Sequence, residues 1–347
     1  MEKAKDFTII TRKDRQILKD ILPLAKPLSI FIEPTNICNF RCAPCVHGND
    51  KTRDDLKPLM HMEMQLFHKV VRDIKNWDGK KPKLIRLAAL GEPLLHPNFL
   101  DMVRILKEAD IAERVDTFTN ASLLDERISE KLVEYGLDSI RVSIYSVIQS
   151  KHAQITKTNA DVKKICRNVA RLKEIKEKRG SKKPYVLVKM FDTYSEENDI
   201  FMDMYKDIAD EVAFEKVNNA TRYSGLDLIK AYYHNKAKEE ATKKEFGSHL
   251  HNHSACPKPF MSLVINSNGD VILCTHDAPK ATKIASAWDR SLEEIWNSDE
   301  LFKFRKMHLE GNKHLNYICK NCDWYKLFPP EDNVDGLPVE IFRPRRS

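Results

Sequence analysis

Short apolar segments alternate along the chain with longer stretches in which apolar residues recur at helical spacing. The apolar segments predict six strands, over residues 28–34, 83–90, 114–119, 139–145, 185–191 and 211–217. The periodic stretches, with apolar side chains three or four positions apart, predict helices over 62–76, 98–109, 125–135 and 161–178. Alternating strands and helices favour an α/β fold with a parallel sheet, in which functional groups gather at the C-terminal ends of the strands.

Three cysteines follow the first predicted strand. Cys38, Cys42 and Cys45 form a CxxxCxxC run on the loop that leaves residues 28–34. Cysteine thiolates are the usual ligands of iron–sulfur clusters, and three of them suit a four-iron cluster with one iron left open. Zinc is the alternative, with His47 as a fourth ligand.

The compartment bears on how these cysteines are interpreted. The chain has no apolar signal segment and no run of 18 or more apolar residues, so we expect a cytoplasmic protein without membrane segments. Thiols stay reduced in the cytoplasm, where clustered cysteines indicate metal binding or catalysis rather than disulfides.

A second set of four cysteines lies near the C-terminal end of the chain. Residues 263–274 hold two apolar runs around a Ser-Asn-Gly-Asp turn, which predicts a hairpin, and residues 288–301 predict a short helix. The four cysteines lie before, in and after these elements, at Cys256, Cys274, Cys319 and Cys322. Four thiolates can hold either zinc or an iron–sulfur cluster, and the spacing alone leaves both open.

The CxxxCxxC run resembles the signature of the radical S-adenosylmethionine (SAM) superfamily, in which the open iron binds SAM. Gly91-Glu92-Pro93 resembles the segment that lines the methionyl amino group, and Thr119-Asn120-Ala121 resembles a Thr-Asn-Gly run, with Ala121 in place of glycine. Ser143 matches a position that contacts the ribose or carboxylate. The resemblance implies a partial (β/α)6 TIM-like barrel, and its candidate SAM contacts are Gly91, Glu92, Pro93, Asn120, Arg141 and Ser143.

The order of hairpin, cysteine, helix and CxxC over about residues 250–325 resembles the Twitch subdomain, a shortened relative of the SPASM domain. This resemblance implies one auxiliary four-iron cluster, with Cys256, Cys274, Cys319 and Cys322 as its ligands. The implied domains are an N-terminal helical extension (1–27), the radical SAM barrel (28–220), a helical insertion or linker (221–255), the Twitch/SPASM-like domain (256–325) and a C-terminal tail (326–347).

The resemblance implies an oxidoreductase of the aminocyclitol-dehydrogenase type. Such an enzyme cleaves SAM to a 5′-deoxyadenosyl radical, takes a hydrogen atom from the substrate and oxidises a secondary alcohol of a sugar, an aminocyclitol or a nucleotide-linked sugar. The auxiliary cluster then accepts an electron. A base must take the alcohol proton, and the candidates are Lys189, Glu215 and Tyr145, at the ends of the fifth, sixth and fourth strands.

Several other functions remain open. Enzymes of this group also modify peptides, including ribosomally made ones, and sugar epimerisation is a further alternative. Epimerisation needs a hydrogen-atom donor, for which Cys166 is the candidate, although its place on the predicted helix 161–178 favours a structural thiol. The non-enzymatic alternative is an interaction protein in which both cysteine sets hold zinc. His249, His251 and His253 are expected to form a polar loop, with metal binding as their alternative.

Charge changes this picture little. The chain has 58 basic and 51 acidic residues, a net charge of +7, which mildly favours anionic partners. No basic motif interleaved with aromatic residues supports binding to nucleic acid. The expected partners are therefore a small, carbohydrate-like substrate and an electron donor of the flavodoxin or ferredoxin type, with neither membrane nor nucleic acid among them.

Overall fold

The strands form a single mixed sheet. The computed structural model describes residues 5–6, 16–219, 227–233 and 235–344. Its ten strands follow the order β1-β7-β6-β5-β4-β3-β2-β8-β9-β10. Neighbouring strands are parallel from β1 to β8 and antiparallel from β8 to β10. The strands are β1 (Lys5–Asp6), β2 (Ser29–Ile32), β3 (Leu84–Leu87), β4 (Val115–Thr119), β5 (Ser139–Ile144), β6 (Tyr185–Phe191), β7 (Glu211–Glu215), β8 (Ser262–Ile265), β9 (Asp270–Ile272) and β10 (Ala285–Ser286).

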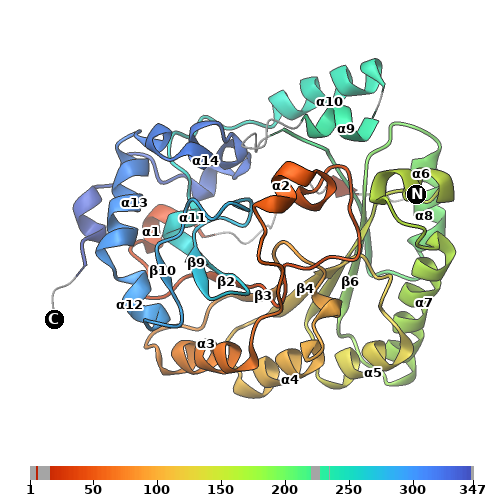
Figure 1. The fold of residues 1–347 in the computed structure, drawn as a ribbon, viewed down its shortest axis with the longest axis horizontal. Coiled ribbons are helices and arrows are strands. Elements are labelled where there is room, and N and C mark those ends of the chain that lie inside the picture. The colour runs from red at the N-terminus through yellow and green to blue at the C-terminus, as the bar shows by residue number, and fades with distance from the viewer. Residues whose placement is uncertain (1–4, 7–15, 220–226, 234, 345–347) are drawn as a thin grey trace.

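The predicted α/β fold with a parallel barrel sheet is confirmed. Strands β2 to β7 each lie within one of the six predicted ranges. Helices α3, α4, α5 and α7 cover the outer side of this sheet (Figure 1). The helices are α1 (Leu18–Ile21), α2 (Asp50–Asp54), α3 (Met64–Asn76), α4 (Phe99–Ala109), α5 (Glu126–Glu134), α6 (Gln149–Thr156), α7 (Val162–Lys178), α8 (Glu197–Tyr205), α9 (Leu228–Tyr233), α10 (Lys236–Ser248), α11 (Lys258–Met261), α12 (Leu292–Trp296), α13 (Asp299–Leu309) and α14 (Tyr317–Lys320).

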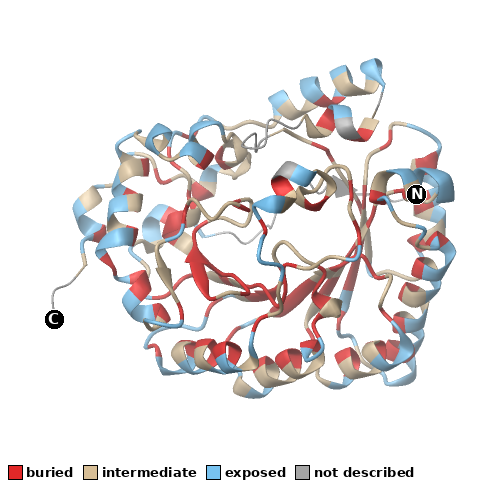
Figure 2. Ribbon diagram, in the orientation of Figure 1, coloured by how far each residue is buried: buried red, intermediate tan, exposed pale blue. Residues whose placement is uncertain are grey.

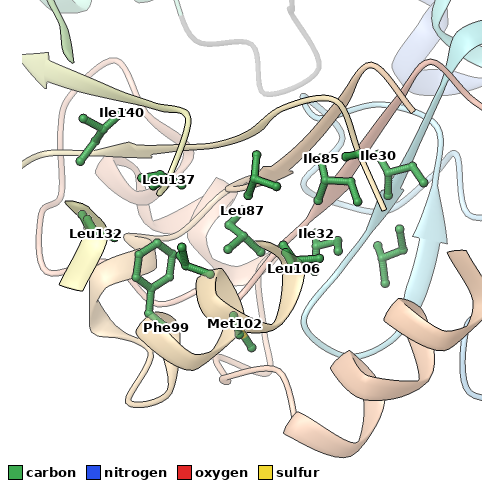
Figure 3. Close-up of a cluster of buried hydrophobic side chains, with 14 of the residues drawn as sticks. Ile30, Ile32, Ile85, Leu87, Phe99, Met102, Leu106, Leu132, Leu137 and Ile140 are labelled. Carbon is green, nitrogen blue, oxygen red and sulfur yellow. The ribbon is translucent and has the colours of Figure 1, made fainter. Parts of the chain in front are cut away.

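The main core lies between the strands and the outer helices. Figure 3 shows Ile30, Ile85 and Leu87 of the strands facing Phe99 and Met102 of α4. These side chains are buried, whereas the outer faces of the helices are exposed (Figure 2). Burial of the apolar side chains drives this packing. The strand ends that carry polar residues are thereby fixed at one rim of the barrel.

The helical extension predicted for residues 1–27 stays a prediction, because residues 1–4 and 7–15 lie outside the described residues. The described remainder holds the two-residue strand β1 and the four-residue helix α1. The helix ends at Ile21 with Leu22 as its C-cap, and Pro23 follows, which cannot continue a helix. Strand β1 pairs with β7 and so extends the barrel sheet by one strand.

The described part of the C-terminal region, predicted as a tail over 326–347, packs against the rest of the chain. Val334 and Phe342 are buried in a small core with Leu18 of α1 and Phe260 of α11. Val334 and Phe342 pack there because both side chains are apolar. Polar residues surround them in the sequence, so no apolar pattern predicts this packing. Residues 345–347 lie outside the described part.

The predicted hairpin is present, as β8 and β9, and it continues the barrel sheet. Strand β8 pairs in parallel with β2, so that Ile265 lies opposite Ile32. The described part of the range predicted as a helical insertion or linker, 221–255, contains α9 and α10. Figure 1 shows these two helices at the edge of the barrel opening.

Candidate functional site

The loop that follows β2 brings Cys38, Cys42 and Cys45 to the C-terminal end of the barrel strands. The backbone N–H of Cys45 donates to the carbonyl of Cys42 (2.9 Å), and the N–H of Gly48 donates to the carbonyl of Cys45 (2.9 Å). Glycine is required at position 48, because an added Cβ would lie 2.1 Å from the Cys42 carbonyl oxygen. No sequence motif indicates Gly48, because its close approach to the Cys42 carbonyl exists only in the folded turn.

Burial controls the chemistry of these three thiols. It raises the pKa of Cys38 to about 12 and also raises the pKa values of Cys42 and Cys45. A thiolate at this place therefore needs a positive partner, which a bound metal cluster supplies because ligation and deprotonation are coupled. The donor set fits an iron–sulfur cluster with three protein ligands.

His47 ties the cysteine loop to the segment after β3. Its side chain is buried, and its Nε2 lies 2.9 Å from the carbonyl oxygen of Leu90. A carbonyl only accepts, so Nε2 carries the proton and donates to it.

Gly91 and Glu92 join two strand ends beside the cysteine loop. A Cβ on Gly91 would lie 2.2 Å from the carbonyl oxygen of Thr35, so only glycine fits this close approach of two backbones. The buried carboxylate of Glu92 accepts hydrogen bonds from the Thr119 hydroxyl (2.7 Å) and the Asn120 N–H (2.8 Å). Burial raises the pKa of Glu92 to about 7. Both carboxylate oxygens are thus used within the protein, and Pro93 begins the short helix Pro93–Leu95 directly after it.

The turn after β4 contacts the cysteine loop through side-chain amides. The Asn120 side chain donates to Asn39 (2.9 Å), which in turn donates to the Ser122 hydroxyl (2.9 Å). Ala121 has a φ of 56°, the left-handed conformation that glycine adopts without strain. The backbone at this position therefore adopts a conformation that favours glycine, although alanine occupies it.

The ends of β5, β6 and β7 line one pocket of about 220 Å³. Ser143, Tyr145, Lys189 and Glu215 all contribute to its wall, together with Phe191. The Lys189 ammonium forms an ion pair with the Glu215 carboxylate. Alternation along the strands explains why residues two apart reach the same side of the sheet.

Tyr145 connects this pocket with the cysteine loop. Its hydroxyl hydrogen-bonds the Cys42 thiol, and the negative charge of a Cys42 thiolate raises the pKa of Tyr145 well above its usual value, with burial adding to the effect. A phenol with such a high pKa is a poor base. Arg141, which lies four residues before Tyr145 on β5, stacks its guanidinium over the Phe118 ring at 5.1 Å.

Three other charged residues, in strands or directly after one, form structural contacts. Arg86 and Asp116 form a buried pair through two hydrogen bonds of 2.6 and 2.7 Å. Glu33 accepts hydrogen bonds from Leu90 (3.3 Å) and from Ser267 in the β8–β9 turn (3.0 and 3.1 Å). Glu33 thus joins the barrel to the hairpin.

The four distal cysteines line a second cavity. Cys256 precedes α11, Cys274 follows β9, and the pair Cys319 and Cys322 lies at α14. A tetrahedral zinc site holds four sulfurs at about 2.3 Å from one ion. Within the described residues, no three His, Cys, Asp or Glu side chains converge on a site of single-ion size. The cavity and its thiol lining fit a polynuclear cluster.

Cys166 and the histidine run lie away from both cysteine sets. The Cys166 thiol packs between outer helices, 3.7 Å from the carbonyl oxygen of Met204 in α8. His249 and His253 bond backbone carbonyls at 2.8 Å, and His251 packs against the ring of His253. These contacts match the structural interpretation of each residue.

Comparison with known proteins identifies both halves of the chain. Residues 32–192 match the radical SAM superfamily, and residues 256–323 match SPASM, an iron–sulfur cluster-binding domain. The cofactors of these two regions are therefore SAM with a four-iron cluster and an auxiliary iron–sulfur cluster. In the described part of the chain, no helix has the length and apolar character to cross a lipid bilayer.

Curated relatives match only part of the chain. A tungsten-containing aldehyde ferredoxin oxidoreductase cofactor-modifying protein of Pyrococcus furiosus is 28% identical over 163 residues, which is 46% of this chain and 42% of the relative. An SAM-dependent 2-deoxy-scyllo-inosamine dehydrogenase of Niallia circulans is 29% identical over 69 residues, or 20% of this chain and 28% of the relative. The chain thus spans less than half the length of these relatives.

Solved structures share the fold over most of the chain. BtrN in complex with AdoMet and 2-DOIA is 20% identical, with a TM-score of 0.56 over 86% of this chain and 93% of that one. SuiB of Streptococcus suis bound to the precursor peptide SuiA is 16% identical, with a TM-score of 0.61 over 88% and 73%. At these identities the likeness concerns the fold alone. The chain thus contains a radical SAM superfamily domain over residues 32–192 and a SPASM-type iron–sulfur cluster-binding domain over residues 256–323.

Proposed function

We propose that this radical SAM enzyme dehydrogenates a secondary alcohol of a small, carbohydrate-like substrate bound among Ser143, Lys189 and Glu215. The observation that carries the proposal is the pocket at the ends of β5, β6 and β7, whose lining includes the Lys189–Glu215 ion pair and Tyr145, which is bonded to Cys42. These polar groups suit a small polyhydroxylated substrate. The partial match to an inosamine dehydrogenase supports the same reaction class.

The cofactor contacts follow from the same arrangement. Cys38, Cys42 and Cys45 are the proposed ligands of the SAM-binding cluster, and the four distal cysteines those of the auxiliary cluster. Because the Glu92 carboxylate already accepts bonds from Thr119 and Asn120, we assign the backbone around Gly91 and Pro93 to the methionyl amino group. The same ring of strand ends presents Asn120, Arg141 and Ser143.

The oxidation removes two electrons and two protons from the alcohol in two stages. When bound, SAM and its cluster supply a 5′-deoxyadenosyl radical, which takes the carbinol hydrogen atom. The substrate radical then loses its hydroxyl proton and one electron, and the C=O bond forms. Glu215 is the proposed proton acceptor, and Lys189 orients its carboxylate. Cys256, Cys274, Cys319 and Cys322 would hold the auxiliary cluster, which when bound would supply an acceptor for this electron and pass it to a carrier of the flavodoxin or ferredoxin type.

The role of Glu215 can be tested with carbinol-deuterated aminocyclitols and sugars. In Glu215→Gln, ketone formation should fall by about 10²-fold or more, the usual contribution of a general base. Deuterium should still enter 5′-deoxyadenosine, because abstraction precedes proton loss. Glu211→Gln is the matched control, since Glu211 lies at the other end of β7 and accepts from the Tyr185 hydroxyl (2.8 Å). Equal ketone yields from the two variants would refute the assignment.

The rival functions predict different products. From the same carbinol-deuterated substrate, epimerisation would give an alcohol whose mass falls only by the exchange of deuterium for one solvent hydrogen at the carbinol carbon, whereas dehydrogenation would give the ketone. A peptide-modifying enzyme would transfer no deuterium from any small alcohol, and its 5′-deoxyadenosine would carry label only from a peptide. Product mass and the position of deuterium therefore separate the three functions in one assay.

A further inference from the structure

We propose that Lys258 is a positioning residue whose ammonium group, held against the Cys274 sulfur, raises the reduction potential of the auxiliary cluster and makes it an electron acceptor. This inference rests on the proposed role of Cys256, Cys274, Cys319 and Cys322 as cluster ligands. It assigns a function to a side chain that no motif singles out.

Three neighbours fix the ammonium group of Lys258. Its Nζ lies 3.7 Å from the Cys274 Sγ, 3.1 Å from the Thr275 hydroxyl and 3.1 Å from the His276 Nδ1. A lysine ammonium only donates, so all three groups accept. The Trp324 ring lies 5.9 Å from Nζ and also packs on the His276 ring at 4.2 Å.

The backbone around Lys258 is similarly constrained. Lys258 begins α11, two residues after Cys256, and stands between Pro257 and Pro259. Each proline fixes its own φ angle, which limits the directions that the lysine side chain can take. The side chain lines the thiol cavity itself.

No carboxylate among the described residues neutralises this charge. None of the ion pairs within the described ranges includes Lys258, and its hydrogen-bond acceptors are a thiol, a hydroxyl and an imidazole. Lys313, the other lysine that lines the cavity, donates instead to the carbonyl oxygens of Cys319 (3.2 Å) and Cys322 (3.3 Å). Lys258 is therefore the cation placed on a ligand sulfur.

A cation at this place favours the reduced cluster for two reasons. A four-iron cluster with four thiolates is an anion, and reduction adds one further negative charge next to the ammonium. Hydrogen bonds to the sulfurs and the local net charge also set the potential of such clusters. The balance is one electron from the substrate radical to the cluster and one proton from its hydroxyl to Glu215. An electron carrier then removes the electron.

The test is the midpoint potential of the auxiliary cluster, measured without substrate. We would reconstitute the full chain with Cys38, Cys42 and Cys45 all replaced by Ala, so that only the distal set holds iron, and titrate it by electron paramagnetic resonance. Lys258→Met should make reduction at least tenfold less favourable, about 59 mV for a one-electron couple. Lys258→Arg keeps the charge and should restore most of the potential.

Two further variants make the outcome decisive. Lys320→Met is the matched control, because Lys320 is exposed, follows Cys319 directly and loses the same charge; its potential should change less than about twofold in equilibrium terms. If Lys258→Met loses its iron, Lys258→Gln replaces it, since Gln keeps an N–H donor without charge. A potential that is the same in the Gln and Arg variants would overturn the proposal, as would one in Lys258→Met equal to that in Lys320→Met. These measurements do not depend on product formation, so their outcome is independent of whether the proposed dehydrogenation is correct.

Discussion

At the scale of single residues, close backbone approaches decide where the strand-end segments lie. At the proposed SAM site, Gly91 packs against two carbonyl oxygens, those of Thr35 and Ile37. The cysteine loop depends on Gly48 in the same way. Glycine has no side chain, so both contacts are made by the backbone alone. A sequence motif can therefore mark Gly91 without showing why glycine is required there.

Gly91→Ala should destabilise the protein and weaken SAM binding. The added Cβ would lie 2.2 and 2.6 Å from backbone oxygens that cannot rotate away, and overpacking of this kind costs about 1–3 kcal/mol. Gly247→Ala is the matched control, since Gly247 lies in α10 with nothing within 4 Å of an added Cβ. That variant should gain about 0.5–1 kcal/mol of helix stability. Urea unfolding and SAM titration compare the two, and equal losses would contradict the account.

At the scale of elements, neighbouring strands are held together by ion pairs of very different burial. Arg86 on β3 and Asp116 on β4 have side chains only 9% and 1% exposed. Lys83 and Glu113, which lie just before the same two strands, are 58% and 51% exposed. Because the two pairs lie on or just before the same two strands, comparing them shows how burial changes the contribution of an ion pair to stability.

Arg86→Ala should cost about 3–5 kcal/mol of unfolding free energy, because it leaves the Asp116 carboxylate buried without its main partner. Arg114 remains 3.6 Å from Asp116, which places the expected loss at the lower end of that range. Lys83→Ala should cost less than about 1 kcal/mol, as exposed pairs do. Denaturation midpoints measure both changes. Similar losses in the two variants would show that burial of the pair does not control its contribution.

The elements also show how far the sequence could be interpreted alone. The six barrel strands, the hairpin and the cysteine sets were predictable, since apolar runs and clustered cysteines are local signals. The contacts of Lys258 with Cys274 and Trp324 were not, because folding brings together three separate segments of the chain. The structural roles of Glu33 and Glu92 were hidden for the same reason: their hydrogen-bond donors lie on other strand ends. Short elements such as α1 and β1 fall below the length at which periodicity is informative.

At the scale of the whole molecule, one sheet joins the two regions that the clusters occupy. Strand β8 pairs with β2, which leads directly into the loop of Cys38, while β9 leads to Cys274. Glu33 reinforces this junction through the β8–β9 turn. The two cysteine sets thus lie at different sites that are joined by one continuous sheet. This arrangement suits the proposed function, in which a radical starts at one site and an electron is removed at the other.

The most direct test of this division is to measure iron and 5′-deoxyadenosine in Cys42→Ala and in the double variant Cys319→Ala/Cys322→Ala. The reconstituted parent should hold about eight iron atoms per chain, in two four-iron clusters. Cys42→Ala should keep about four and form no 5′-deoxyadenosine from SAM and reductant, whereas the double variant should keep about four and still form it. SAM cleavage at the parent rate in Cys42→Ala, or zinc in place of iron in either set, would contradict the account.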